Sequence, residues 1–447
     1  MSRPEAIRLT LITILMLLTA VPVPGEDAEP ARERTRDDYE LMKLFVETYE
    51  QIDSNYVRDV DRRELMEAAI RGMLDHLDPY SSYIPRTDVR RFDQAVEQEF
   101  GGIGIQVNAS AGRLTVISPL PGTPAFRAGI RSGDSIVEVD GRNTDGFTVS
   151  DAVKVLQGPP GRPVSLGIRR SASEDTQHLT IIREVIQVPT ILGDHYNDQG
   201  QLEYMLDGEN KIACIRVSHF SRHTASELRR ALDSLMEQGL KALVLDLRSN
   251  PGGLLEAAIE MADLFLESGD IVSVKGRNVP DRSWKAKKGD ASYPQFPIAV
   301  LVNRFSASAS EVLGACLQDN GRAIIVGERT WGKGSVQNVI RLESGDSAMK
   351  LTTASYHRPS GVNIHRFPDS KKEDDWGVKP NEGFDISLTP EEWEQWITDQ
   401  ERQSVVPAEG ITPPERTFQD PQLSKARTCL VEKLAAPAVA AEPAANP

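Results

Sequence analysis

Cysteine and histidine are both scarce in this sequence. Its 447 residues include three cysteines and seven histidines. Three cysteines are too few for a disulfide scaffold, and no cluster of Cys and His indicates a structural zinc site. Bases are in deficit as well, since 51 Lys and Arg against 66 Asp and Glu leave a formal net charge of −15. Because nucleic-acid binding depends on cations that neutralise phosphates, this balance argues against a nucleic acid as the main partner.

Long hydrophobic runs are also rare. The apolar run Leu9–Val21 is preceded by Arg3 and Arg8 and ends shortly before Gly25. It has about 13 residues, fewer than the ~20 of a membrane span. A basic start, a short apolar stretch and a small residue before an acidic break predict a secretory signal over residues 1–25. We therefore expect export to a bacterial periplasm or cell envelope and no membrane span after cleavage. The alternative is an uncleaved N-terminal anchor.

The two ends of the remaining chain have little apolar content. Residues 26–36 are charged and contain proline, which predicts a linker, and residues 435–447 are almost all Ala and Pro. Such a tail buries too little apolar surface to offset the entropy of ordering, so we expect it to be disordered.

Residues 37–96 have helical periodicity. Met42, Phe45 and Tyr49 recur at spacings of three and four, which predicts an amphipathic helix, and a second helix is predicted over Arg63–His76. Two helices alone bury little surface. This region must therefore pack on another domain or on a second subunit.

Residues 97–186 combine short apolar strands with many glycines. Gly102, Ile103, Gly104 and Ile105 form a glycine loop before a strand, and one helix follows late, after the capping-box pattern Thr148–Asp151. This order resembles a PDZ domain. Glycines permit the tight loop whose N–H groups would bind a peptide carboxylate, while the rest of the peptide adds as a strand. The alternative is a glycine turn in a small β-barrel without a ligand.

Residues 187–390 alternate buried strands with helices. Strands rich in β-branched residues joined by helical crossovers predict an α/β core with a mostly parallel sheet. In such sheets, sites form where strands end and lead into helices. The loops of interest are therefore 248–253, 303–310 and 327–337. The predicted strands are Ile212–Val217, Ala242–Arg248, Ile298–Val302 and Ala323–Gly327, and the predicted helices are Ala225–Gln238, Leu254–Phe265 and Ser308–Asp319.

The third loop has the spacing of a phosphate-binding loop. Gly327, Gly332 and Lys333 follow a strand, which suggests a nucleotide enzyme. That motif needs Ser or Thr next and then a helix, whereas position 334 is Gly and Val336–Leu342 alternates like a strand. The nucleotide interpretation is therefore rejected.

The second loop carries three serines at a predicted helix start. Ser306 and Ser310 are expected to be helix caps, the usual role of serine in this context. Ser308 lies in the favourable field of the helix N-terminus, but a free alcohol is a poor nucleophile without a base. None of the seven histidines is expected to be that base, because His195, His219 and His223 lack a paired acid and the other four lie in the helical region, the PDZ-like region or a downstream strand and turn. A lysine serves instead if burial lowers its pKa, and Lys333 lies between two glycines.

These motifs resemble those of the carboxyl-terminal processing peptidases, a family of serine–lysine endopeptidases with a PDZ domain, also called tail-specific proteases. The resemblance covers roughly residues 39–430, in family order. It implies Ser308 as nucleophile, Lys333 as general base and Gln337 as the residue that orients the lysine. The matching segments are Leu77–Pro85, Asp246–Gly253, Ser306–Glu311, Thr330–Gln337, Leu351–Tyr356, Pro359–Gly361 and Gly377–Pro380.

The same resemblance implies an oxyanion hole. Preorganised N–H groups stabilise the charge that acyl transfer places on the carbonyl oxygen. Ala309 would supply one N–H group and either Gly252 or Gly253 the other, a choice that the sequence leaves open. The chain departs from the commonest family pattern at Trp331, where Phe is usual, and at Asn381, where Asp is usual. Both departures bear on the shape of the substrate pocket.

The fold that follows is α/β. A crotonase-like, ClpP-like peptidase core (187–390) carries an inserted PDZ-like β-barrel domain (97–186) and helical segments at its N- and C-terminal ends (37–96 and 391–434). We expect endoproteolysis near the C-terminus of protein substrates, with Gly102–Ile105 capturing the free tail. No metal or organic cofactor is implied, and the resemblance suggests that the N- and C-terminal helices support a homodimer. The alternative function is an inactive scaffold that binds protein C-termini. The three cysteines are expected to be free thiols.

Overall fold

The computed structural model describes residues 36–110, 112–170, 175–197, 199–287, 293, 296–407 and 415–436. The chain divides into two compact units, Met1–Ala69 and Ile70–Pro447. The predicted signal 1–25 lies outside the described residues, as do nearly all of the predicted linker 26–36 and tail 435–447.

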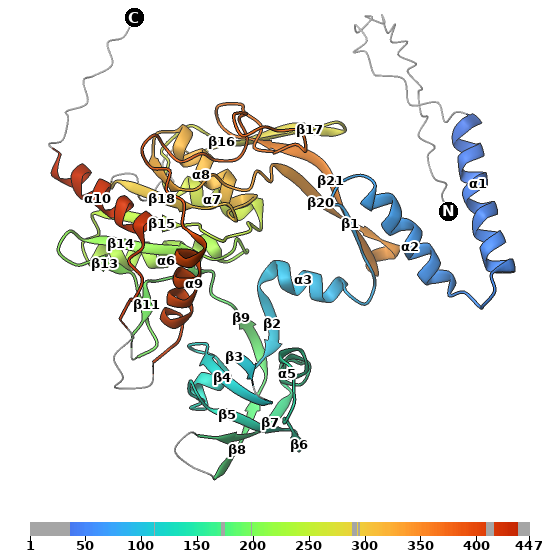
Figure 1. Ribbon diagram of the computed structural model, residues 1–447, viewed down its shortest axis with the longest axis horizontal. Coiled ribbons are helices and arrows are strands. Elements are labelled where there is room, and N and C mark those ends of the chain that lie inside the picture. The colour runs from blue at the N-terminus through green and yellow to red at the C-terminus, as the bar shows by residue number, and fades with distance from the viewer. Residues whose placement is uncertain are drawn as a thin grey trace, which may run out of the picture. The chain divides into compact units, whose positions relative to one another are not determined.

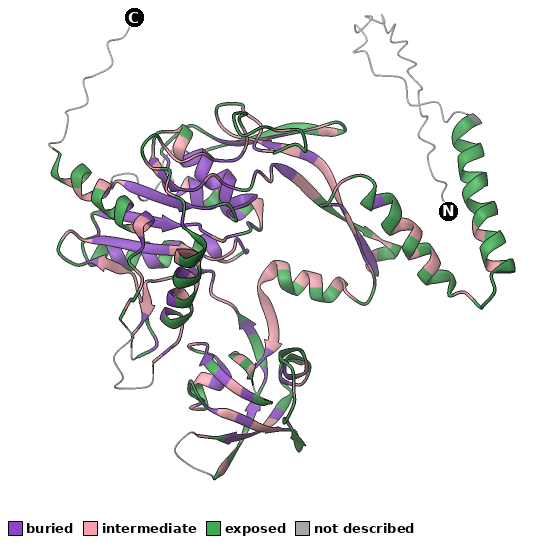
Figure 2. Cartoon of the chain, in the orientation of Figure 1, coloured by how far each residue is buried: buried purple, intermediate pink, exposed green. Residues whose placement is uncertain are grey.

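The N-terminal helical region forms α1 (Arg36–Asn55) and α2 (Arg62–Asp75), close to the predicted bounds. The apolar side chains of α1 remain in solvent, as the green colour of that helix shows (Figure 2). Tyr39, Leu41 and Met42 are 72%, 63% and 64% exposed. An amphipathic helix gains most of its stability from burying its apolar face, and among the described residues of its own unit α1 leaves that face exposed.

The glycine-rich region forms one antiparallel sheet with a short helix. The sheet has the order β3-β4-β5-β7-β8, with β6 beside β5, and among the described residues no pairing joins β8 back to β3, so the sheet stays open. Thr148 and Asp151 cap α5 reciprocally, as predicted: each backbone N–H donates to the other's side chain, at 3.2 Å. The elements are β3 (Ile105–Ser110), β4 (Arg113–Pro119), α4 (Pro124–Arg127), β5 (Ser135–Val139), β6 (Arg142–Asn143), α5 (Val149–Leu156), β7 (Pro163–Arg169) and β8 (Thr176–Ile182).

A two-stranded ribbon and one helix lead into and out of this domain. α3 (Val89–Glu97) precedes β2 (Glu99–Gly102), which pairs antiparallel with β9 (Glu184–Gln187). Both ends of the inserted domain therefore run through the same ribbon (Figure 1).

The α/β core that follows the inserted domain is built on a mostly parallel sheet of order β10-β14-β15-β18-β19, with β13 at the side of β14. The pairs β14–β15, β15–β18 and β18–β19 are parallel, as the alternation of strands and helices predicted. β10 and β13 are antiparallel additions. The elements are β10 (Ile191–Leu192), β13 (Met205–Asp207), β14 (Ile212–Val217), α6 (Thr224–Glu237), β15 (Ala242–Asp246), α7 (Leu255–Asp263), β18 (Ile298–Val302), α8 (Ala309–Asp319) and β19 (Ala323–Gly327).

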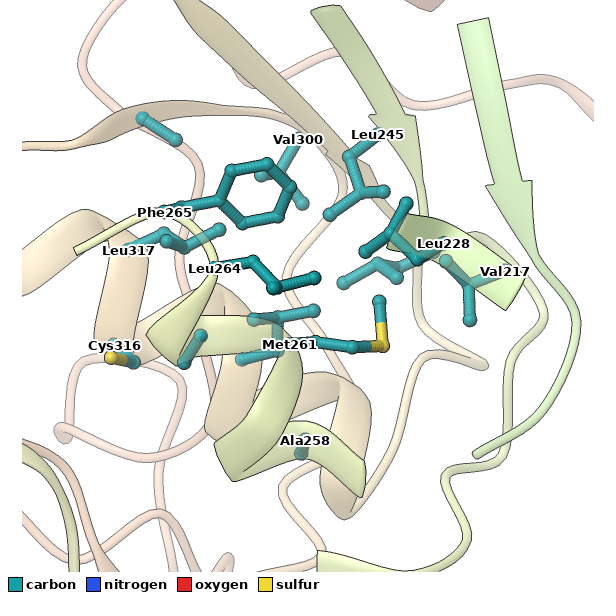
Figure 3. Close-up of a cluster of buried hydrophobic side chains, with 14 of the residues drawn as sticks. Val217, Leu228, Leu245, Ala258, Met261, Leu264, Phe265, Val300, Cys316 and Leu317 are labelled. Carbon is teal, nitrogen blue, oxygen red and sulfur yellow. The ribbon is translucent and has the colours of Figure 1, made fainter. Parts of the chain in front are cut away.

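Each parallel strand has buried side chains on both faces of the sheet. On one face the strands pack against α6, α7 and α8, where Met261 and Phe265 reach between helix and sheet (Figure 3). The opposite face packs against Ala426 and Leu430 of α10 (Pro421–Ala435). This two-sided burial explains the continuous apolar runs in the sequence. Side chains on the helical face include Val217, Leu228, Leu245, Val300 and Leu317.

A second, antiparallel sheet carries the segments that follow the parallel sheet. Its order is β1-β21-β16-β17, with β20 beside β21. β20 begins directly after Gly334, so a strand follows Lys333 where a phosphate-binding loop needs a helix. The remaining elements are β1 (Ser82–Ile84), β11 (His195–Tyr196), β12 (Leu202–Glu203), β16 (Asp270–Gly276), β17 (Val279–Lys285), β20 (Ser335–Leu342), the short 3-10 turn Glu343–Gly345, β21 (Ser347–His357) and α9 (Pro390–Gln403).

The C-terminal helices are attached to the core by a buried ionic cluster. The Arg248 side chain is 2% exposed and pairs with Asp246 and with Asp420, each at 2.7 Å. It also donates to Gln422 at 2.9 Å. Burial by itself would raise the pKa of Asp246, but Arg248 overcomes this and holds that pKa below its usual value. The arginine thus ties the end of β15 to the start of α10.

The three cysteines are free thiols, as expected, with Cys214 and Cys316 buried. Within the described ranges, every helix is too short or too polar to cross a lipid bilayer.

Candidate active site

The strand-to-helix turn after β18 holds Ser308 in a strained backbone conformation. Its φ of 58° and ψ of −116° lie in a region that non-glycine residues rarely adopt. Such strain costs on the order of 1–3 kcal/mol and persists only where the surroundings enforce it. Ser308 immediately precedes α8 and is 9% exposed. The turn therefore presents this serine at a helix N-terminus with part of its surface accessible.

Contacts with residues 247–253, the loop that contains Gly252 and Gly253, enforce the turn. The Ser306 hydroxyl donates to the carbonyl of Leu247 at 2.8 Å, and the Ser310 hydroxyl donates to the carbonyl of Asn250 at 3.0 Å. These two serines were predicted to be helix caps, and that prediction is wrong. A cap accepts a hydrogen bond from a helix N–H group, whereas both hydroxyls here bind carbonyls of another loop.

Glu311 is the centre of the site. Its carboxylate is fully buried in the first turn of α8. One oxygen, Oε2, accepts from the backbone N–H of Ser308 and from that of Lys333, both at 2.8 Å. The other, Oε1, accepts from the N–H of Gly332 at 2.6 Å and from the hydroxyl of Thr330 at 2.5 Å. Burial raises the pKa of Glu311, although these four donors oppose the shift.

The shared oxygen brings the serine loop and the lysine loop together. Each backbone nitrogen lies 2.8 Å from Oε2, so the nitrogens of Ser308 and Lys333 are at most 5.6 Å apart, twice 2.8 Å. The two residues are separated by α8 and β19 in the sequence. One buried carboxylate therefore fixes the spacing of both backbones.

The lysine loop requires its glycines. A Cβ atom on Gly332 would lie 2.6 Å from the Cβ of Arg366, and one on Gly334 would lie 2.2 Å from the backbone nitrogen of His365. Lys333 is partly buried between them, and its Nζ lies 5.3 Å from the ring centre of Tyr80. Burial lowers the pKa of Lys333, the nearby Lys350 lowers it further, and Glu311 opposes the shift. A larger fraction of Lys333 is therefore neutral at a given pH than of an exposed lysine.

Gly252 and Gly253 differ in what their N–H groups bind. Asn250 is fully buried and accepts from the N–H of Gly252 at 2.8 Å. Among the described residues, the N–H groups of Gly253 and Ala309 have no hydrogen-bond partner. A Cβ atom on Gly252 would lie 2.7 Å from the Cβ of Ser308. The loop 248–253 thus lies against the serine at Gly252, and the next residue in that loop, Gly253, has a free N–H group, as does Ala309.

Gln337 is the third residue of β20. Its side-chain nitrogen donates to the hydroxyl of Ser335 at 2.8 Å and to that of Thr352 at 3.3 Å. In the described part of the chain no hydrogen bond joins Gln337 to Lys333. Both printed bonds use the side-chain nitrogen of Gln337, and its role in orienting Lys333 stays a prediction.

A cavity of about 540 Å³ opens beside the lysine loop. Aromatic residues from three segments line it, namely Tyr80, Trp331 and Phe367. His365 also lines it, and its Nδ1 is buried without a partner among the described residues. Burial lowers the pKa of His365. An aromatic cavity with a few polar groups suits an apolar side chain.

The predicted carboxylate loop lies between β2 and β3. Ile103 and Gly104 direct their carbonyls inward, where they accept from the N–H groups of Ala125 and Leu120, both at 2.9 Å. Gly104 has a φ of 79°, and a Cβ atom there would lie 2.4 Å from Thr123. The loop is thus a tight turn that glycine permits.

Two histidines have acidic partners, which the sequence analysis did not expect. His195 Nδ1 lies 3.0 Å from Asp194, and His223 Nε2 lies 2.9 Å from Glu99. Neither pair includes a residue of the Ser308 turn. The described residues contain no group of three or more His, Cys, Asp and Glu side chains suited to a metal ion.

Sequence reasoning missed Glu311 and Asn250 as members of the site. The signal for Glu311 was present, because Ser308-x-x-Glu311 has the spacing of a capping box. Asn250 had no comparable signal. Its importance comes from contacts with Gly252, with the carbonyl of Val217 and with the serine turn, all distant in sequence or set by loop geometry.

Comparisons with known proteins agree with this architecture. A model of peptidase family S41 matches residues 211–381, a PDZ-domain model matches 115–170, and a model of the activating protease CtpB N-terminal domain matches 22–87. The carboxy-terminal-processing protease of Bartonella bacilliformis is 38% identical over 362 residues, 79% of this chain and 80% of that protein. The carboxy-terminal processing protease CtpA of Bacillus subtilis is 38% identical over 320 residues, 71% of this chain and 65% of that protein.

The solved structures that this chain matches include a photosystem II D1 C-terminal processing protease. It is 29% identical, with a TM-score of 0.43, and the match covers 78% of this chain and 93% of that one.

Proposed function

The chain belongs to peptidase family S41 and is a serine-type C-terminal processing peptidase with a PDZ domain, and we propose that Ser308 and Lys333 perform its chemistry. The observation that carries this proposal is the pair of hydrogen bonds from their backbones to one oxygen of Glu311. Positioning of a nucleophile and its base supplies much of an enzyme's rate. A fully buried anchor on both backbones supports such positioning.

In the proposed reaction, the Ser308 hydroxyl oxygen attacks the scissile carbonyl carbon while neutral Lys333 takes the hydroxyl proton. The tetrahedral oxyanion accepts hydrogen bonds from the N–H groups of Ala309 and Gly253, which are free to donate. Collapse breaks the C–N bond, and the departing amine takes the proton from Lys333. Water then attacks the ester carbonyl carbon while Lys333 takes a proton from it. The bond between that carbon and the Ser308 oxygen breaks, Lys333 returns the proton to Ser308, and the second product leaves with a carboxylate.

The lowered pKa of Lys333 supports its role as base. A lysine at its ordinary pKa is almost wholly protonated at neutral pH and accepts no proton. Burial makes the neutral form more populated. The cavity lined by Tyr80, Trp331 and Phe367 is proposed to hold an apolar substrate side chain next to the scissile bond.

Variants of the two residues test the dyad. Purified full chain is compared with Ser308→Ala, Lys333→Ala and Lys333→Arg on a peptide with an apolar C-terminus, with products identified by mass spectrometry. All three variants should lose cleavage, and Lys333→Arg should fail because arginine keeps its proton. Lys241→Ala, an exposed lysine, serves as the matched control. Full activity in any of the three variants would refute the assignment.

The same assay addresses the alternative function. An inactive scaffold would bind the peptide yet leave it intact with the native chain, so binding without cleavage favours that reading.

We further propose that Gly102–Ile105 captures the free C-terminus of the substrate. The tight turn at Gly104 supports this role. Peptides with an amidated C-terminus should be cleaved more slowly than the same peptides as free acids. Equal rates would count against carboxylate capture.

Export and dimerisation are proposals of the same kind. The basic, apolar start of the sequence supports export, which N-terminal sequencing of the protein recovered from a periplasmic fraction would test. The exposed apolar side chains of α1 support self-association. Analytical ultracentrifugation should detect a dimer, and a monomer at every concentration would rule it out.

A further inference from the structure

A groove of about 700 Å³ lies between α3 and α5. From α5 it is lined by the half-exposed Val153, and Gly101 closes it at the strand that leads into the predicted carboxylate loop. α3 contributes Arg90 and Arg91. The apolar side chain and the glycine fit the terminal residue of a peptide. The positive charge of the arginines is complementary to the negative C-terminal carboxylate of a peptide.

The charge of the groove has one sign. Arg90, Arg91 and Lys154 line it, and its lining contains no Asp or Glu. Arg91 lies 3.8 Å from Asp88 and Lys154 lies 3.3 Å from Asp151, but all four side chains are at least 45% exposed. Pairs of this kind are weak and easily exchanged. Arg90 is exposed and has no ion-pair partner among the described residues.

α3 presents its acidic side chains to the peptidase core. Asp93 pairs with Arg341 of β20 at 2.5 Å, and Glu97 pairs with Arg222 ahead of α6. The helix is thereby joined to the strand that follows the Lys333 loop. The arginines in the groove therefore belong to an element that is attached to the core and lies before the residues matched by the PDZ-domain model, 115–170.

We propose that Arg90 and Arg91 of α3, together with Lys154 of α5, bind the C-terminal carboxylate of the substrate. Carboxylate recognition is then shared between the PDZ domain and a helix outside it. This inference rests on the proposed capture of tails by the PDZ domain. It adds that the backbone loop alone does not provide the whole carboxylate site.

The test is a comparison of two ligands on two proteins. Full-length Ser308→Ala chain, which holds peptide without cutting it, binds a fluorescent peptide ending in Val-COOH or in Val-CONH₂, and fluorescence anisotropy gives each Kd. The acid-to-amide preference is then measured in the same chain with Arg90→Gln and Arg91→Gln added. The matched control adds Arg113→Gln, an exposed arginine of β4 outside the groove.

We expect the preference for the acid to fall roughly five- to tenfold in the double arginine variant, because exposed charge-assisted contacts contribute modestly. Affinity for the amide should stay unchanged, as should both affinities in the Arg113 control. The preference of the unaltered groove should also weaken with added salt. Both arginines are exposed, so thermal unfolding should match that of the Ser308→Ala parent.

The possible failures are distinct. If the parent chain binds acid and amide equally, PDZ capture of a carboxylate is refuted, and this inference falls with it. If the parent prefers the acid and the double variant keeps that preference undiminished, capture stands and the role of α3 is refuted. If the double variant loses acid and amide equally, the arginines bind another part of the peptide, which also overturns the inference.

Discussion

Ser308 and Lys333 donate their backbone N–H groups to the same oxygen of Glu311, each at 2.8 Å. The relationship joins the start of a helix to a glycine-flanked loop. Because the carboxylate is fully buried and accepts four hydrogen bonds, moving either loop would leave polar groups unpaired in the protein interior.

Replacing Glu311 tests whether this carboxylate positions the site. Glu311→Gln puts an NH₂ group where N–H donors now meet an oxygen, so kcat/KM should fall about a hundredfold and the free energy of unfolding by about 3 kcal/mol. Peptide cleavage and denaturant titration measure the two effects. Glu260→Gln, on the exposed side of α7, is the control. Unchanged kcat/KM in a folded Glu311→Gln chain would contradict the positioning role.

The pH dependence should report the lowered pKa of Lys333. The base acts only when neutral, so kcat/KM should rise with pH to a plateau. The midpoint of that rise should lie below 10.5, the ordinary pKa of a lysine. Lys350 lowers this pKa by repulsion, so Lys350→Gln should move the midpoint to higher pH. Lys241→Gln should leave it in place. A midpoint that shifts downward in Lys350→Gln would contradict the electrostatic account.

Lys333 also makes stability depend on pH. Between its lowered folded pKa and 10.5, the unfolded chain binds more protons at this site than the folded chain. The contribution of Lys333 to the free energy of unfolding therefore rises with pH through this window and is least favourable below it. Lys333→Met should remove that rise and stabilise the chain at neutral pH, as measured by denaturant titration at several pH values. An unchanged slope would argue that Lys333 is solvated.

Two glycines with a positive φ, Gly252 and Gly239, should respond differently to substitution by alanine. In Gly252→Ala the new Cβ would lie 2.7 Å from both the Ala307 carbonyl oxygen and the Ser308 Cβ, so cleavage should fall more than about tenfold as the serine turn shifts. Gly239→Ala also places an alanine at a positive φ, 83° against 100° at Gly252, but its Cβ would meet no atom within 4 Å. It should lose about 1 kcal/mol of stability and keep full activity. Equal losses of activity in both would attribute the effect to strain alone.

The buried arginine cluster predicts a large loss of stability. Arg248→Ala would leave Asp246 and Asp420 buried without their partner, a change that costs about 3–5 kcal/mol. Arg427 is 54% exposed and pairs with the buried Asp207, which also accepts two hydrogen bonds from Asn210, so Arg427→Ala should cost less than about 1 kcal/mol. Thermal unfolding of both variants measures the difference. Similar losses would show that burial does not determine the strength of these pairs.

Sequence reasoning was most reliable where burial is regular. The strands Ile212–Val217, Ile298–Val302 and Ala323–Gly327 have the bounds that their apolar runs predicted. Both faces of these strands are buried, so every residue contributes to the signal. The capping box at Thr148 and Asp151 was equally legible, because its contacts lie within three residues.

Predictions that depend on contacts between loops were less reliable. Ser306 and Ser310 bind carbonyls of the glycine loop, which no local pattern indicates. The contacts of Gln337 with Ser335 and Thr352 likewise depend on the register in which β20 pairs with β21, which no local pattern indicates, while its role beside Lys333 stays a prediction. The sequence left the choice between Gly252 and Gly253 open, and a side-chain contact from Asn250 now distinguishes their amides.

The sequence by itself determined the order of elements, the parallel core and the residue types available for chemistry, because periodicity, glycine spacing and short motifs are local properties. Only the tertiary structure decided that Glu311 holds Ser308 and Lys333 together, that Gly253 keeps a free N–H group, and that α3 turns its arginines to one groove and its acids to the core. Those relationships arise from packing between segments far apart in the chain. That packing removes water from the buried carboxylate, which strengthens its hydrogen bonds and makes an unpaired polar group costly.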